Sequence, residues 1–249
     1  MDAMAVSALD IEAVVFDMDG LLLDTESLAM RGLAQAAAAR GVDAPEEFRH
    51  AMIGVPADHC RLLVMERFGA DFPVDEFLTE ASHWMSELIE VGALQVKPGV
   101  LELLSDLDRI GMPKAVATSS SRAKASHHLR SVGLLERFDA IVTRSDVESG
   151  KPRPDLFLRA AQLLGRRPGR CLALEDSYNG IRAAHTAGMP VIMVPDLLPP
   201  TAEMRDRCLM IAPDLHAVRR LIPRNTEQDA ESASILSVDT ALLAAGRAG

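Results

Sequence analysis

Acidic side chains, hydroxyl groups and one lysine follow successive apolar segments of this chain. Asp17 and Asp19 come directly after the apolar run 12–16, and Thr118 opens a run of hydroxyl residues that ends the next apolar segment. In an open parallel sheet, ligands bind where loops leave the carboxyl ends of the strands, so these side chains are expected to meet at one edge. The candidate residues are Asp17, Asp19, Thr118, Ser119, Lys151, Glu175 and Asp176.

Asp17 and Asp19 are two residues apart, so their side chains would point the same way if the strand continued. Two like charges in one cleft are kept either by sharing a proton, which raises one pKa, or by a cation between them. Glu175 and Asp176 add negative charge, which favours a hard divalent cation. Mg²⁺ prefers oxygen ligands and commonly joins one or two carboxylates to a substrate phosphate, so the pattern predicts a magnesium site and a phosphate substrate.

Phosphoryl transfer gives each of these groups a role. The Asp17 carboxylate can attack phosphorus and form an aspartyl-phosphate, which divides one difficult hydrolysis into two easier steps. Asp19 is suited to general acid–base catalysis on the leaving group and on water. Thr118, with the backbone N–H of Ser119, is predicted to hold phosphate oxygens. Lys151 is predicted to offset charge on the nucleophile and the transferring group.

Apolar strands alternate with helical segments that end at glycine, the residue that closes a helix in the left-handed conformation. This alternation predicts an α/β fold, a doubly wound parallel sheet with helices on both faces. The predicted strands are 12–16, 113–118, 139–143, 170–175 and 190–194, and the predicted core helices are 99–110, 122–132, 154–164 and 178–187.

Between the first two strands lies an insert that is rich in helix formers and has no convincing strand. Helices are expected at 27–40, 57–68 and 74–90, with Trp84 and the methionines of the insert in its core. Two connections would join the insert to the sheet and serve as hinges. The predicted division is an α/β core of residues 1–26 and 97–223, a helical cap of residues 27–96, and a tail of residues 224–249 that is assigned no function.

Four segments, FDMDGLLLDTE, AVATSSS, SGKPRPD and LALEDSYNGI, resemble the four ordered motifs of the haloacid dehalogenase superfamily. The resemblance spans residues 13 to about 190, and the insert is similar to the cap of the branch containing β-phosphoglucomutase and sugar-phosphate phosphatases. It implies that Asp17 is the nucleophile, Asp19 the acid/base, Thr118 the motif-two hydroxyl and Lys151 the motif-three lysine. It also implies that Asp176 with Glu175 holds Mg²⁺, and that Asp19 binds the metal through its backbone carbonyl.

Each motif alone has a plainer interpretation. A DxDG segment favours a turn, and the acidic segment 175–177 favours the start of a helix. Lysine, however, occurs only at positions 97, 114, 124 and 151, so its presence at the motif-three position carries weight. The agreement of all four motifs at successive strand ends favours the catalytic interpretation.

Members of the superfamily differ from one another at a few motif and cap positions, and the residues at those positions in this sequence distinguish between them. Dehalogenases proper lack the second aspartate of motif one, so Asp19 argues against them, and phosphonatases need a cap lysine, which residues 27–96 do not contain. β-Phosphoglucomutases carry a histidine where this chain has Ala29 and an arginine in the loop that here reads Gly54-Val55-Pro56-Ala57. Hydrolysis of a small phosphate monoester, such as a sugar phosphate or a nucleoside monophosphate, is therefore favoured. A phosphosugar mutase and a catalytically inactive metabolite-binding protein remain the alternatives.

Composition limits the partners. The chain has 249 residues, 48% of them hydrophobic, and a net charge of −10, which argues against a nucleic-acid partner. No apolar run approaches the ~20 residues of a membrane helix, and the amino-terminal segment is acidic where a secretory signal would be basic. The three cysteines form no CxxC pair. These features predict a cytoplasmic enzyme, a monomer or small homo-oligomer that acts on a small phosphorylated metabolite and binds neither nucleic acid nor a membrane.

Overall fold

The computed structural model describes residues 10–53, 55 and 57–221. The predicted tail of residues 224–249 lies outside this range, as do residues 1–9 of the predicted core and Gly54 and Pro56 of the cap loop. The described residues contain no helix that is both long and apolar enough to span a bilayer.

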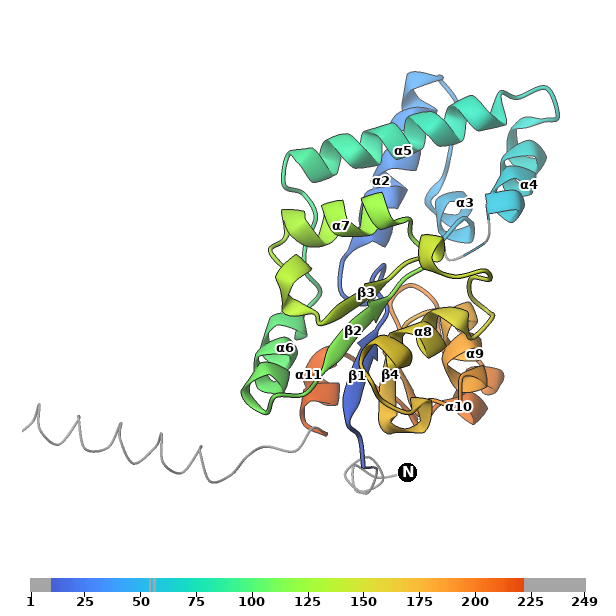
Figure 1. Ribbon diagram of the computed structural model, residues 1–249. Helices are drawn as coiled ribbons and strands as arrows, with labels where there is room; N and C mark the ends of the chain where they lie inside the picture. The colour runs from blue at the N-terminus through green and yellow to red at the C-terminus, as the bar shows by residue number, and fades with distance from the viewer. Residues whose placement is uncertain (1–9, 54, 56, 222–249) are drawn as a thin grey trace, which may run out of the picture.

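A parallel sheet of six strands, in the order β3-β2-β1-β4-β5-β6, forms the centre of the molecule (Figure 1). The strands are β1 (Ala13–Phe16), β2 (Lys114–Ala117), β3 (Ala140–Val142), β4 (Cys171–Glu175), β5 (Val191–Met193) and β6 (Met210–Ile211). The first five agree with the strands predicted from apolar runs. β6 was not predicted, because a two-residue edge strand is too short to produce a recognisable alternation.

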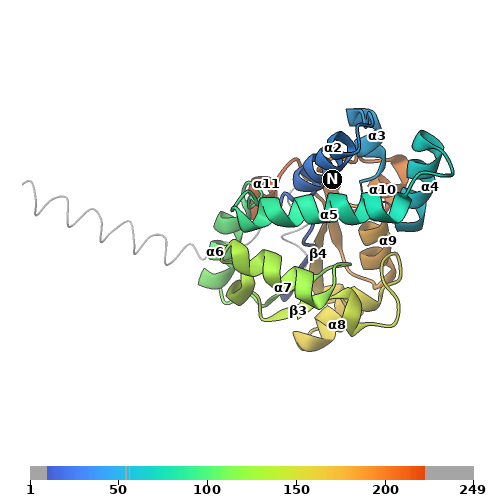
Figure 2. The same cartoon turned by 90° about the horizontal axis from the view of Figure 1, so that it is seen from above.

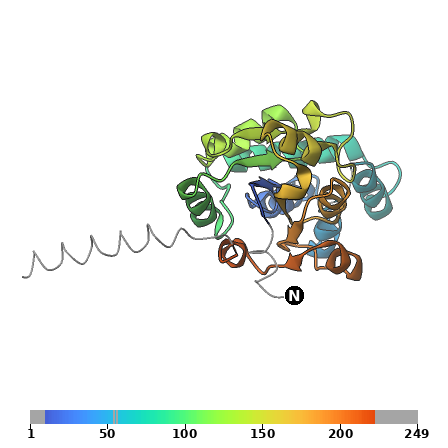
Figure 3. The same cartoon turned by 60° about the horizontal axis from the view of Figure 1, so that its bottom comes forward.

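Helices cover both faces of the sheet, as predicted. Val14 and Phe16 of β1 pack with α6 (Val100–Arg109), α7 (Arg122–Ser131) and α11 (Leu215–Arg219). Ala13 and Val15 point the other way and pack with α8 (Asp155–Leu163), α9 (Tyr178–Thr186) and α10 (Ala202–Arg207), and Figure 3 shows the two groups on opposite sides of the strands. Burial on both faces explains why the central strand reads as a continuous apolar run.

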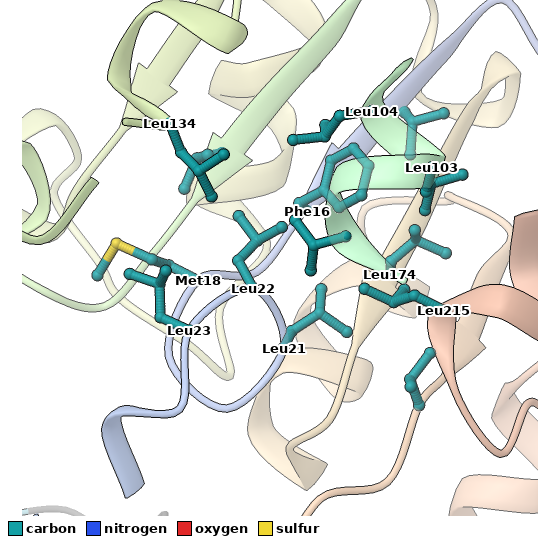
Figure 4. Close-up of a cluster of buried hydrophobic side chains, with 14 of the residues drawn as sticks. Phe16, Met18, Leu21, Leu22, Leu23, Leu103, Leu104, Leu134, Leu174 and Leu215 are labelled. Carbon is teal, nitrogen blue, oxygen red and sulfur yellow. The ribbon is translucent and has the colours of Figure 1, made fainter. Parts of the chain in front are cut away.

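The loop that follows β1 is part of the core as well as of the site. Met18, Leu21, Leu22 and Leu23 are at most 2% exposed and join the cluster around Phe16 (Figure 4). This packing holds the backbone of the first motif in place, so the polar residues between these apolar anchors are positioned by the core.

Each glycine that was predicted to close a helix has a positive φ: Gly41, Gly69, Gly92, Gly111, Gly133, Gly165 and Gly188.

The insert forms a helical cap above the sheet (Figures 1 and 2). It contains α2 (Thr25–Ala39), α3 (Glu46–Ala51), α4 (Ala57–Phe68) and α5 (Val74–Glu90), and α3 was not predicted. Phe68 contacts Phe48, Phe72 and Phe77 within its core. The prediction for Trp84 was wrong, because its side chain is 36% exposed.

The two connections between cap and core run side by side. Asp24 N donates to Gln95 O at 3.0 Å, and Lys97 N donates to Leu22 O at 2.9 Å. An antiparallel bridge pairs Leu23 with Val96. The two connections therefore form one hydrogen-bonded junction beside the carboxyl end of β1, and a hinge at this junction stays a prediction.

Candidate active site

The predicted residues gather at the point where the direction of the sheet winding reverses. The chain goes from β1 to β2 and β3 on one side, and then returns to β4 on the other side of β1. Asp17 follows β1, Asp176 follows β4, and Asp17 N donates to Leu174 O at 3.0 Å. Such a switch point is where open α/β sheets bind ligands.

Lys151 lies between two buried carboxylates. Its ammonium contacts the Asp17 carboxylate and donates to Glu175 Oε1 at 2.6 Å. The side chains of Lys151, Asp17 and Glu175 are only 5%, 8% and 0% exposed. A buried ion pair of this kind requires good geometry and hydrogen bonds to offset the loss of hydration. The sequence predicted that residues 17 and 151 would meet, and the structure brings them into contact.

The loop that carries Lys151 is held by its own polar side chains. Asp146 accepts hydrogen bonds from the backbone N–H and the hydroxyl of Thr143 at 2.7 and 2.6 Å. Asp155 accepts one from Ser149 N at 3.2 Å. The Lys151 ammonium also lies 5.2 Å from the centre of the Phe157 ring, close enough for a cation–π contact.

The Glu175 carboxylate uses both of its oxygens. Oε1 accepts from Lys151, whereas Oε2 accepts from the backbone N–H of Asp176 and of Ser177, both at 2.9 Å, and from the Ser177 hydroxyl at 3.0 Å. These bonds hold the Glu175 carboxylate in one position beneath Lys151.

Asp19 is held by the hydroxyl residues that follow β2. Its Oδ2 accepts from the Ser120 hydroxyl at 2.8 Å and from the Thr118 hydroxyl at 3.3 Å. Thr118 is fully buried and also accepts from Ser120 N at 3.0 Å. Ser119 lines the same cavity. Hydroxyl groups that follow β2 therefore orient a carboxyl group that follows β1.

The acidic residues fit a divalent cation. Asp17, Glu175 and Asp176 each offer an oxygen, and these oxygens lie within 4.8 Å of one another. Among the described residues, Asp176 Oδ1 and Asp19 Oδ1 are buried and have no hydrogen-bond partner. Unsatisfied buried oxygens beside like charges are costly unless a cation or another donor completes them.

The pKa values of the pocket residues reflect the same crowding of carboxylates. Burial raises the pKa of Asp17 to about 7; Lys151 opposes this change, and Glu175 and Asp19 add to it. Burial, followed by the charges of Glu175 and Asp17, also holds the pKa of Asp176 well above its ordinary value. Burial would lower the pKa of Lys151, but Asp17 and Glu175 raise it above its usual value, so the lysine is charged.

A cavity of about 730 Å³ opens above these groups, between the sheet and the cap. That volume lies within the range of small-molecule sites. The lining residues are Asp17, Asp19, Thr25, Glu26, Ala29, Met52, Ile53, Val55, Met85, Thr118, Ser119, Lys124, Arg144, Gly150, Lys151, Asp176, Ser177 and Asn179.

Several residues in and around the site were not selected from the sequence, and three of them bear on the predicted groups. Ser120 belongs to the noted hydroxyl run, but only the fold shows that its hydroxyl contacts Asp19. Glu26 lines the cavity, and burial, followed by the charge of Asp196, raises its pKa to about 8. Gly180 lies beneath the Glu175 carboxylate, where an added Cβ would come within 1.6 Å of Oε1. The sequence did contain one signal for Gly180. It lies in the first turn of a predicted helix, where alanine would be more favourable than glycine.

Gly180→Ala is expected to lower kcat by about 10- to 100-fold. The new methyl group must displace the Glu175 carboxylate that holds Lys151, and a displacement of about 1 Å in an active site costs a rate of that order. Steady-state kinetics of phosphate release would measure it. Gly169→Ala is the matched control, because its Cβ would have only Gly188 O nearby, at 3.7 Å. Equal rates for the two variants would show that the position of Glu175 does not matter.

Comparison with known proteins identifies the family. Residues 11–188 match the model of the haloacid dehalogenase-like hydrolases. The phosphorylated carbohydrates phosphatase of Thermotoga maritima is 32% identical over 72% of this chain and 82% of its own length.

Solved structures agree with this match. The crystal structure of CbbY from Rhodobacter sphaeroides in complex with phosphate superposes with a TM-score of 0.67 at 30% identity, covering 82% of this chain and 95% of that one. A family hydrolase from Deinococcus radiodurans R1 with bound phosphate and sodium gives 0.73 at 27% identity, covering 86% and 99%. The chain belongs to the haloacid dehalogenase-like hydrolase family, as a hydrolase of the phosphatase type.

Proposed function

We propose that this enzyme hydrolyses a small phosphate monoester in a Mg²⁺-dependent reaction, through an aspartyl-phosphate formed on Asp17. The observation that carries the proposal is the joint placement of Asp17, Lys151 and Asp19 on one wall of a cavity large enough for a phosphorylated metabolite. Asp17 contacts a buried ammonium that the Glu175 carboxylate holds in place. This arrangement supports a nucleophilic carboxylate beside a fixed positive charge.

In the first step an Asp17 oxygen attacks phosphorus, and the bond between phosphorus and the ester oxygen breaks. Asp19, in its protonated form, gives its proton to the departing alkoxide, which leaves as an alcohol. The hydrogen bonds from Ser120 and Thr118 orient the Asp19 carboxyl for this transfer. Lys151 balances the negative charge that develops on the transferring phosphoryl group.

In the second step Asp19, now a carboxylate, takes a proton from a water molecule that attacks the phosphorus of the aspartyl-phosphate. The bond between phosphorus and the Asp17 oxygen breaks, which releases inorganic phosphate and regenerates the free carboxylate. Thr118 and the backbone N–H of Ser119 are suited to hold the phosphate oxygens in both steps, because both residues line the cavity.

Asp17 and Asp176 are the side chains that we propose to hold Mg²⁺, together with the backbone carbonyl of Asp19. The unpartnered Asp176 Oδ1 supports this assignment. Glu175 belongs to the same acidic group, but both of its oxygens already accept hydrogen bonds, so its main role in this proposal is to orient Lys151. When bound, Mg²⁺ would neutralise the crowded carboxylates and screen the phosphate oxygens.

Hydrolysis is favoured over the two alternatives by particular observations. A mutase needs a cationic site for a second phosphate, and the described cap residues that line the cavity include none. An inactive metabolite-binding protein would have no need for a buried lysine held between two carboxylates. The net charge of −10 also supports a small metabolite as partner, and we propose a cytoplasmic location on the basis of composition.

Phosphate release from a panel of small esters, measured with Mg²⁺ and again after EDTA treatment, tests this function. We expect turnover with Mg²⁺ and a loss of at least about 10²-fold with EDTA, because the like-charged pocket cannot then accept a phosphate dianion. Restoring Mg²⁺ should restore the rate. Undiminished hydrolysis in EDTA would contradict the metal assignment, and no release from any ester would contradict the enzymatic function.

A further inference from the structure

The two walls of the active-site cavity differ in chemistry. The core wall carries carboxylates, hydroxyl groups and cations, whereas the residues that the cap places around the ligand space beyond its junction with the core are apolar. These are Ala29, Met52, Ile53, Val55 and Met85, which we call the cap wall. Met52 and Ile53 are each 7% exposed, and α5, which carries Met85, runs across the top of the cap (Figure 1).

A charged group on the leaving alcohol would lie against this cap wall without a partner. Burying an anion without a partner is strongly unfavourable, so a second phosphate or a carboxylate is disfavoured there. An uncharged surface, in contrast, gains from contact with methionine and aliphatic side chains, which pack well against flat rings and hydrocarbon.

The cations on the cavity lining belong to the core side. Arg144 already donates to the carbonyl oxygens of Val147 and Glu148, at 2.9 and 3.2 Å. Lys124 is exposed in the first turn of α7, directly after the loop that carries Thr118. These positions suit attraction of the phosphate that is transferred, and they leave the cap wall without positive charge.

Glu26 adds a polar feature at the junction of the two walls. Its Oε2 is buried and has no hydrogen-bond partner among the described residues, and its side chain lines the cavity. A hydroxyl group on the ligand, which can both donate and accept, satisfies a buried carboxyl of this kind in either protonation state.

We propose that the preferred substrates carry a single phosphate on an uncharged leaving group, with hydroxyl groups near the ester and an apolar body against the cap wall. Nucleoside 5′-monophosphates have this chemistry, whereas sugar bisphosphates and phosphorylated carboxylic acids do not. The inference rests on the proposed phosphatase function and assigns its specificity to the cap wall, with Met85 as a specificity-determining residue.

The test compares kcat/KM for uridine 5′-monophosphate, glucose 1,6-bisphosphate and phosphoglycolate, with p-nitrophenyl phosphate as a general reporter of phosphatase activity. We expect the nucleotide to be favoured by at least about 10-fold over each charged competitor, since the difference is one unpaired buried charge. Equal or better turnover of the bisphosphate or of phosphoglycolate by the wild-type enzyme would overturn the inference.

A charge added to the cap wall provides the second measurement. Met85→Lys is expected to shift the ratio of kcat/KM values toward the bisphosphate by about 10-fold, because the new ammonium pairs with the second phosphate. Leu62→Lys is the matched control, because Leu62 is 51% exposed on α4 and lies outside the cavity lining. An unchanged ratio in folded Met85→Lys would overturn the inference.

Val55→Lys is a second cap-wall variant for the case in which Met85→Lys does not fold. The kcat/KM ratios of the wild-type enzyme test the inference without either variant. Release from p-nitrophenyl phosphate with a preference for a charged leaving group would overturn this inference alone. Failure to hydrolyse every ester, the reporter included, would overturn the phosphatase function and this inference with it.

Discussion

Asp17→Asn should lower kcat by at least about 10³-fold, the order of loss expected when a covalent nucleophile is removed. The amide is close in shape to the carboxyl group, so it keeps the packing at the end of β1. It cannot form the acyl phosphate, however, and Lys151 then faces a neutral group. Phosphate release under saturating substrate and Mg²⁺ would measure the effect. Asp71→Asn, the same change in an exposed loop, is the control and should leave kcat unchanged.

The same substitution should stabilise the metal-free protein at neutral and alkaline pH. The pKa of Asp17 is raised by burial from 3.8 to about 7. The folded state therefore binds the proton more tightly than the unfolded state, and wild-type stability falls as pH rises from about 4 to 7. Asparagine does not ionise, so this loss is absent in the variant.

Thermal unfolding in EDTA at about pH 5 and about pH 8 would test this linkage. We expect the melting temperature of Asp17→Asn to exceed that of the wild type by more at the higher pH. A variant that retained most of its activity would exclude Asp17 as the nucleophile. A variant that was less stable at the higher pH would show that the contact with Lys151 outweighs the crowding of the carboxylates. The expected result would show that the Asp17 carboxylate lowers the stability of the folded protein while it serves catalysis.

Lys151→Met should remove both activity and stability. The methionine side chain is similar in length but uncharged, so the buried Asp17 and Glu175 carboxylates lose their shared partner. Breaking a buried ion pair in this way costs about 3–5 kcal/mol of unfolding free energy. The loss of positive charge beside the transferring phosphoryl group should lower kcat by about 10²- to 10³-fold.

Lys114→Met separates the two effects. Lys114 is also buried, at 6% exposure, and its ammonium contacts Asp108; neither residue lines the cavity. Both variants should unfold at lower denaturant concentration, whereas only Lys151→Met should lose turnover at temperatures where it is folded. Equal kcat values for the two folded variants would exclude an electrostatic role for Lys151.

Local patterns in the chain were sufficient to predict five of the six strands and the outline of the site. β1 (Ala13–Phe16) is buried on both faces, so its apolar run is unbroken, and the acidic residues that follow it must lie at the carboxyl end of a central strand. The glycines that end helices were also predictable from the sequence, because a positive φ is a requirement of a single residue and its neighbours. The contact between Asp17 and Lys151 followed from topology, since parallel strands bring their carboxyl ends to one edge.

Tertiary structure decided the features that depend on contacts between segments far apart in the chain. The Ser120 hydroxyl was one of several candidates until the fold placed it against Asp19, 101 residues away. The Glu175 carboxylate turns toward Lys151 because Gly180 leaves room for it and two backbone N–H groups hold it there. Neither cause is visible in a local window of residues.

The same reason explains the predictions that failed. β6 pairs with β5 through only two residues, and Trp84 lies on the exposed side of an amphipathic helix whose orientation depends on its packing against α2. The apolar cap wall also depends on this packing, since α2, α5 and the turn after α3 each contribute to it. Periodicity shows that a helix has a buried face, but only the assembled fold determines whether that face meets a core or a ligand.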